Sequence, residues 1–229
     1  MRIITNESHI KTRTRIGERA PFVGFAMLAA AMFFIFWKPE LFWVTMILVW
    51  GGFAVSLTGS YLGDRYVGPL AHYKKVPEAL KGLDNRYTLL MYKTPLPFVL
   101  LDPGGVTVIT VKSQGGAIRY RNGKWHHRER MGFLRRMAGQ ENIGRAHRMA
   151  HSDVAEMQQF LNKVLPEDAD VPVRSVLLFI NPSVELDAED SPVPALRLAQ
   201  LKRWLRKDGR WSKLPDETLQ CVEQALGVE

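Results

Sequence analysis

Cysteine is nearly absent from this chain: Cys221 is the only one among 229 residues. A single thiol excludes an intrachain disulfide and any metal site built from several cysteines, and it fits a reducing compartment. The chain also lacks a Walker loop, a G-x-S-x-G elbow, an H-E-x-x-H motif and a glycine-rich dinucleotide fingerprint. No local motif therefore supports one of these enzyme classes, and no small-molecule cofactor is expected.

Charge is missing from two long stretches, residues 20–37 and 41–62. Each is about the length that crosses the hydrocarbon core of a bilayer, and only Lys38-Pro39-Glu40 separates them. The sequence therefore predicts a two-helix transmembrane hairpin over residues 20–63, with the lipid bilayer as its partner. The competing interpretation is a helical hairpin buried in a soluble core. Gly51-Gly52 and Gly59-Ser60 favour close packing of membrane helices.

The flanks of the hairpin predict its orientation. Residues 1–19 form a basic arm with five Lys/Arg, whereas the connecting loop holds only Lys38. Residues 64–83, read as a juxtamembrane linker with a short helix, add further basic residues, among them Arg65, Lys74 and Lys75. The positive-inside rule places both termini in the cytoplasm. Residues 84–229 would then form a cytoplasmic α/β domain.

The stretch from Leu96 to Trp125 predicts the centre of that domain. Val106 to Val111 alternates Val, Ile and Thr, is apolar on both faces and predicts a central strand covered on both sides. Turn residues flank it: Asp102 to Gly105 before, and Gln114 to Gly116 after. Asn122-Gly123 is a hairpin dipeptide. The expected arrangement is a three-strand antiparallel meander.

This pattern resembles the nuclease-related domain, NERD, from the restriction-endonuclease-like superfamily. The resemblance is carried by the turn rich in Pro and Gly, the strand V-x-V-I, Lys112 at its end, the Gly-Gly turn, and Trp125 after the N-G turn. It extends over residues 68–227 and implies an αβββαβ fold. It also implies a Mg²⁺-dependent nuclease site, made of a carboxylate at the start of the second strand and E-x-K near the end of the third.

Most of that implied site is missing from the chain. Lys112 occupies the lysine position, but Thr110 stands where the glutamate is expected, and Pro97 stands where the aspartate is expected. Asp102 lies five residues beyond Pro97, beside Pro103, where a turn residue is the plainer interpretation. Mg²⁺ needs hard oxygen ligands, so it is expected only if another acid completes the site.

Residues 112–148 carry ten Lys/Arg against two Glu. Such an excess suits nucleic-acid phosphates, anionic lipid headgroups or a solvated loop. Only one aromatic residue, Phe133, lies within residues 131–148, so lipid and solvent are favoured over nucleic acid. The candidate binding residues are Arg119, Arg121, Lys124, Arg128, Arg130, Arg135 and Arg136.

The rest of the chain predicts alternating elements. Ser152 to Leu165 predicts an amphipathic helix capped by Ser152, and Val173 to Ile180 predicts a buried strand. An acidic loop is expected over 181–194. Helices are expected over 195–206 and 215–226.

Three functions remain open. The first is a non-catalytic NERD-like binding module at the cytoplasmic membrane face. The second is a Mg²⁺-dependent nuclease that uses Lys112 with Asp102 or another acid. The third is an accessory subunit of a membrane complex, which exposed small-residue faces on the hairpin would favour.

Overall fold

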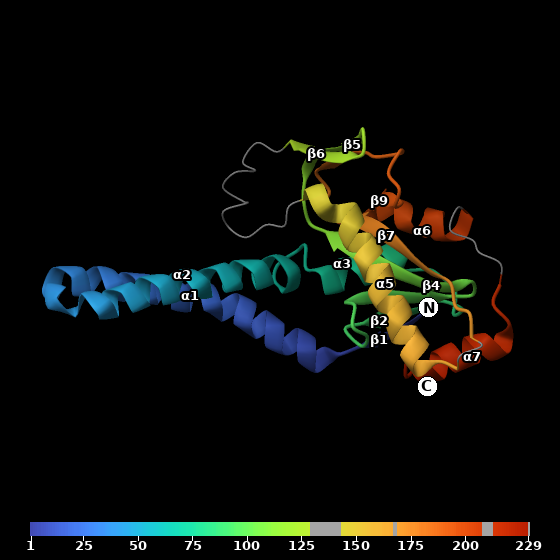
Figure 1. Cartoon of the computed structure of the whole chain (residues 1–229), viewed down its shortest axis with the longest axis horizontal. Helices are drawn as coiled ribbons and strands as arrows, with labels where there is room; N and C mark the ends of the chain where they lie inside the picture. Colours follow the sequence, from blue (N-terminus) through green and yellow to red (C-terminus); the bar gives the residue numbers. More distant parts are fainter. Residues whose placement is uncertain (129–142, 167–168, 208–212, 229) are drawn as a thin grey trace. The chain divides into compact units, whose positions relative to one another are not determined.

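The computed structural model describes residues 1–128, 143–166, 169–207 and 213–228, and Figure 1 labels its elements where there is room. The chain divides into two compact units. The hairpin unit contains residues 7–71. The α/β unit contains residues 1–6 and the described residues from His72 to Val228, so the hairpin is inserted between the first strand of the α/β unit and the remainder of it.

The hairpin unit consists of two helices, α1 (Glu7–Trp37) and α2 (Phe42–Tyr66), joined by the short 3₁₀ helix η1 (Pro39–Leu41). Both long helices are long and apolar enough to cross a membrane. The residues read as a basic arm are structured instead. Arg2–Thr5 form strand β1. Helix α1 begins at Glu7, so its first turns contain charged residues and the apolar run continues the same helix.

Small side chains recur every seven residues along the seam between α1 and α2. The buried positions at this spacing are Gly17, Gly24 and Ala31 on α1, and Thr45, Gly52 and Gly59 on α2. The backbones approach closely there. A Cβ built on Gly24 would lie 2.7 Å from the carbonyl oxygen of Gly52, and one on Gly59 would lie 2.6 Å from Cδ of Pro21. The seven-residue spacing keeps these small residues on the face of each helix that contacts its neighbour, and glycine lets the helices pack at short range.

Large apolar side chains point away from this seam and are exposed within the unit. They include Phe22, Phe25, Met32, Phe36, Trp43, Ile47, Trp50 and Phe53. The expected close packing through Gly52 and Gly59 therefore occurs inside the hairpin, where Gly51 also contacts Met27. The outward surface offers bulky side chains of the kind that lipid tails accommodate.

The larger sheet of the α/β unit has the order β1-β2-β3-β4-β7-β9. Its strands are β1 (Arg2–Thr5), β2 (Thr88–Met91), β3 (Phe98–Asp102), β4 (Gly105–Lys112), β7 (Val173–Phe179) and β9 (Ala195–Arg197). Strands β2, β3 and β4 run antiparallel in turn, whereas β1 is parallel to β2 and β7 is parallel to β4. The domain is thus mixed α/β.

Strand β4 is central and buried on both faces, as its β-branched sequence predicts. The predicted meander consisted of β3, β4 and the strand that follows β4. The observed meander consists of β2, β3 and β4, because the strand after β4 belongs to a different sheet. The chain after β4 leaves the sheet at the Gly115-Gly116 turn. A parallel strand, β7, takes the free edge of β4 instead.

A second, smaller sheet has the order β6-β5-β8. Its strands are β5 (Gly116–Arg121), β6 (Lys124–Arg128) and β8 (Val184–Asp187), which lies within the predicted acidic loop. The predicted hairpin turn is confirmed. Asn122 and Gly123 both have positive φ, 51° and 75°, which is the backbone of a type I′ turn.

Helices cover both faces of the larger sheet. Val106 and Val108 pack against Met157 and Leu161 of α5 (Ala146–Val164), and Val222 of α7 (Asp216–Ala225) joins the same core. Thr107 alternates to the opposite face, where its partner across the strands is Arg174. The Arg174 guanidinium stacks 4.9 Å from the ring of Trp204 on α6 (Leu198–Lys207). Helix α3 (His72–Leu80) packs against α6.

Two predicted helix starts are wrong. After the 3₁₀ turn η2 (Ile143–Arg145), α5 begins at Ala146, so Ser152 lies inside the helix and does not cap it. Residues 195–197 form β9 and α6 starts at Leu198, because pairing with β7 satisfies the backbone of these three residues. The predicted strand over 173–180 and the predicted last helix are confirmed.

The hairpin seam yields a test with opposite signs. Replacing Gly24 with Ala should lower stability by about 1–3 kcal/mol, because the added methyl group meets Gly52 backbone at 2.7 Å. Replacing Gly63 of α2 with Ala should stabilise by up to about 1 kcal/mol, because its Cβ meets nothing within 4 Å and alanine favours the helix. Thermal unfolding of the full chain in detergent measures both. Equal shifts in one direction would contradict the seam.

Candidate functional site

Four side chains of β4, at every second position of the strand, face helix α5: Val106, Val108, Thr110 and Lys112. Lys112 is the residue that the NERD resemblance singles out, and only 1% of it is exposed. Its Nζ donates to the sulfur of Met149 on α5 at 3.4 Å. A thioether is a weak acceptor, and it is burial beneath the helix that keeps the amine away from solvent.

Asp153 is the acid that the fold brings to this position. It projects from α5, and Thr110 Oγ1 donates to its Oδ2 at 2.6 Å. Burial raises the pKa of Asp153, while the hydrogen bond from Thr110 and the positive charge of Lys112 act in the opposite direction. A carboxylate from a helix thus stands beside the threonine that replaces the expected glutamate.

Sequence reasoning missed Asp153 because it placed the helix start at Ser152. With the helix starting at Ala146, the buried positions Ala146, Ala150, Met157 and Leu161 define its inner face. Asp153 follows Ala150 by three residues and precedes Met157 by four, so it falls on that face. A carboxylate on the apolar face of an amphipathic helix is the signal that identifies it.

Asp102 lies at the opposite end of β4 from Lys112. It pairs with Gly105 across the β3–β4 turn, and Lys112 is seven residues further along the strand, about 23 Å away at the usual rise. The structure therefore does not bring Asp102 and Lys112 together. A site that combines the two is not formed.

Asp102 has a structural role in a buried ion pair. Its Oδ2 accepts hydrogen bonds from Arg174 at 2.8 Å and from Thr107 at 2.9 Å, and its Oδ1 accepts from the Gly104 amide at 2.9 Å. Arg174 also donates to Thr107 at 2.7 Å. The side chains of Asp102 and Arg174 are 6% and 11% exposed. This network closes the β3–β4 turn and fixes the register of β7 beside β4.

The residues around Lys112 do not fit a Mg²⁺ ion. Among the residues that the structure describes, no three His, Cys, Asp or Glu side chains come together at a distance suited to a metal. Asp153 is a single carboxylate, and extending the β3–β4 register by two residues sets Pro97 opposite Thr110. The two positions where the resemblance implies carboxylates thus hold a proline and a threonine.

The second candidate site is the outward face of the β5–β6 hairpin. Its cross-strand pairs are Ala117 with Arg128, Arg119 with His126, and Arg121 with Lys124. Because side chains alternate along a strand, all six residues share one face. Ile118, Tyr120 and Trp125 point the other way and are buried, with the Tyr120 and Trp125 rings 5.1 Å apart. The aromatic core therefore holds the basic face toward solvent.

Charge on this face is divided between its two edges. Arg121 binds both carboxylate oxygens of Asp187 at 2.8 and 2.9 Å, and it contacts Asp190 at 3.2 Å, so its charge is compensated on the β8 side. Lys124 and Arg128 lie on the edge strand β6 and are exposed. The basic surface predicted from sequence therefore narrows to Arg119, Lys124 and Arg128. Arg130, Arg135 and Arg136 lie outside the described residues.

Comparison with known protein families, with curated proteins and with solved structures found no match to this chain. Its function is therefore argued from its own residues.

The Asp102–Arg174 pair can be tested against an exposed pair. Replacing Asp102 with Asn should destabilise the α/β unit by about 3 kcal/mol, because Arg174 keeps a buried charge without its carboxylate. Replacing Asp187 with Asn breaks an ion pair whose side chains are 48% and 45% exposed, and it should cost less than about 1 kcal/mol. Denaturant unfolding, followed by tryptophan fluorescence, measures both. Equal losses would show that burial of the Asp102 pair is unimportant.

Proposed function

We propose that this chain is a membrane-anchored, NERD-like binding module that uses the basic edge of its β5–β6 hairpin to bind anionic lipid headgroups. The hairpin helices anchor it, both termini lie in the cytoplasm, and the domain does not cleave nucleic acid. The observation that carries the proposal is the register that sets Arg119, Lys124 and Arg128 on one exposed face.

The order of elements supports the resemblance to NERD. Among the described helices and strands, and with the β5–β6 hairpin set aside, α3, β2, β3, β4, α5 and β7 occur in the order αβββαβ. The antiparallel strands β2, β3 and β4 are followed by β7 parallel to β4, and Lys112 ends the third of them. The carboxylate positions beside Lys112 are empty of acids, which favours binding over cleavage.

The insertion of the hairpin supports the topology. Residues 2–5 pair with residues 88–91, so the strand before α1 and the strands after α2 belong to one domain. If α1 and α2 both cross the bilayer, their outer ends must emerge on the same side. The excess of Lys and Arg at those ends, against Lys38 in the loop, favours the cytoplasm as that side.

Anchoring strengthens weak attraction to the membrane. One Lys or Arg near an anionic surface contributes about 1 kcal/mol, which alone is too little for stable binding. A domain tethered to the same bilayer meets headgroups at a high effective concentration, so three cations without an ion pair among the described residues suffice. Such binding should weaken as salt is added.

Hydrogen exchange of the full chain in lipid nanodiscs tests this function. Amides of β6 should exchange more slowly when phosphatidylglycerol is added to phosphatidylcholine. The Lys124→Gln and Arg128→Gln double variant should lose about 2 kcal/mol of that protection, at about 1 kcal/mol per cation. Lys213→Gln makes a charge change away from this face and should keep the protection in full. The full chain is required because β1 is part of the sheet.

Two other outcomes would reassign the protein. Equal exchange on both kinds of nanodisc, with salt-sensitive retention of RNA or DNA by the same face, would make it a nucleic-acid binding module. Cleavage that requires Mg²⁺ or Mn²⁺ and is lost in both Lys112→Ala and Asp153→Asn would show a working nuclease with a rearranged site. The accessory-subunit function has less support, because the small residues of the hairpin pack within it.

A further inference from the structure

The α/β unit contains a cleft of about 660 Å³ that is lined neither by Lys112 nor by the basic residues of the β5–β6 hairpin. Its walls are the loop of residues 82–87 before β2, the β3–β4 turn at residues 102–104, the end of α6 and Lys213. This volume lies within the range of small-molecule sites. Parts of the chain that are far apart in sequence thus meet around one hollow.

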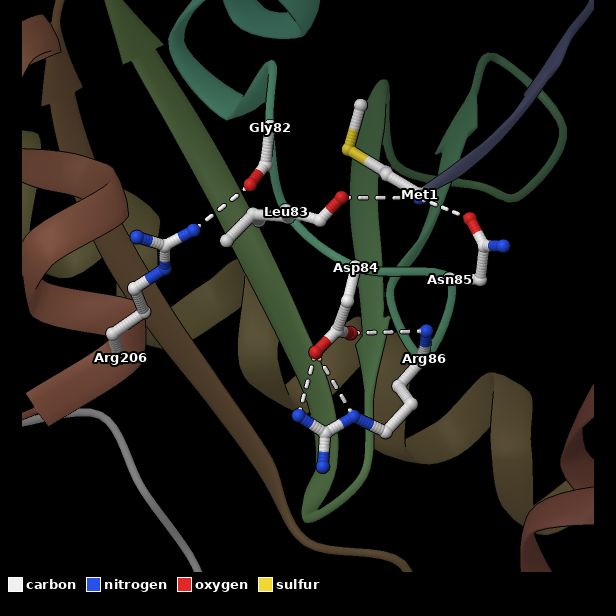
Figure 2. A network of polar contacts seen from close by, with 7 residues as sticks. All are labelled: Met1, Gly82, Leu83, Asp84, Asn85, Arg86 and Arg206. Atoms are coloured by element: carbon white, nitrogen blue, oxygen red, sulfur yellow. Dashed lines mark hydrogen bonds and ion pairs between the residues drawn. The ribbon is translucent and has the colours of Figure 1, made fainter.

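The loop that forms one wall is fixed from both sides, as Figure 2 shows. Arg206 on α6 donates to the carbonyl oxygen of Gly82 at 2.8 Å. The Met1 amine donates to the carbonyl oxygen of Leu83 at 3.2 Å and to Oδ1 of Asn85 at 2.9 Å. Because the loop is held at Gly82, Leu83 and Asn85, this wall is formed before a ligand arrives, which lowers the entropic cost of binding.

Both carboxylates of the lining are already neutralised by arginines. Asp84 accepts from Nε of Arg86 at 3.0 Å, and this hydrogen bond lowers the pKa of Asp84. Asp102 is held by Arg174 at 2.8 Å. Both acids are therefore already engaged by arginines, which offsets their charge toward an incoming anion.

Two cations of the lining remain uncompensated. Arg206 donates to a neutral carbonyl group, and Lys213 is exposed. Neither forms an ion pair within the described part of the chain. A guanidinium has five N–H donors, so Arg206 keeps several for a ligand while one holds Gly82. Arginine and lysine together are a common pair for phosphate oxygens.

The remaining lining suits an apolar or flat body. Leu83 and Leu205 are buried, Pro103 lies at the turn, and the ring of Tyr87 is half-buried. Burial, together with Asp102 and Asp84, raises the pKa of the Tyr87 hydroxyl above its usual value. Tyr87 therefore stays protonated at physiological pH and can donate a hydrogen bond.

We infer that this cleft binds a phosphate-bearing small molecule of mononucleotide size, with the phosphate on Arg206 and Lys213 and the ring among Leu83, Pro103, Leu205 and Tyr87. The inference does not depend on lipid binding by the β5–β6 hairpin. It uses different residues, and each site supplies a control for the other.

Isothermal titration of the full chain in detergent tests the inference, with AMP, inorganic phosphate and adenosine as probes. AMP should bind saturably and more tightly than phosphate, and adenosine should bind more weakly than AMP. Lys213→Gln should weaken AMP binding about tenfold, the usual effect of losing one charge-assisted hydrogen bond. Lys124→Gln removes the same charge from the β6 edge and should leave AMP binding unchanged.

A second variant guards against unfolding. Tyr87→Phe keeps the ring and removes the hydroxyl, and it should weaken AMP binding several-fold at an unchanged melting temperature. No saturable binding of AMP would overturn the inference, and so would adenosine binding as tightly as AMP. An equal loss of AMP affinity in Lys213→Gln and Lys124→Gln would also overturn it, because the net charge of the protein, and not this cleft, would then explain the binding.

Discussion

Parallel pairing of β1 with β2 ties the beginning of the chain to the domain that follows the hairpin. Ile3 lies beside Leu89 and Ile4 beside Leu90, and the Met1 amine adds hydrogen bonds to Leu83 and Asn85. The hairpin must therefore leave and re-enter the same domain within residues 7–71. This connection makes α1 and α2 an insertion, and it gives the edge of the larger sheet a partner strand.

Buried polar groups fix the geometry on either face of β4. On one face, Thr110 and Lys112 meet Asp153 and Met149 of α5. On the other, Thr107 joins Asp102 and Arg174 beneath Trp204 of α6. Each network links the central strand to a helix by directional bonds, which apolar packing alone does not supply. The lysine that suggested a nuclease thus belongs to the packing between β4 and α5.

Local sequence patterns predicted the elements better than their pairing. The charge-free runs, the β-branched strand at 106–111 and the Asn122-Gly123 turn each depend on near neighbours, so they were identified correctly. The role of β1 was missed, because four residues pair with a strand more than eighty positions away. The pairing of β4 with β7 also depends on distant residues. Asp102 was correctly read as a turn residue, but its pairing with Arg174 has no local signal.

The single cysteine can report the membrane topology of the chain. Cys221 is exposed on α7, and Lys38 lies between the two long apolar helices. A membrane-impermeant maleimide should label Cys221 only from the cytoplasmic side of sealed vesicles. In a Cys221→Ser background, Lys38→Cys should be labelled only from the opposite side. Labelling of both positions from one side would contradict a membrane-spanning hairpin inserted into a cytoplasmic domain.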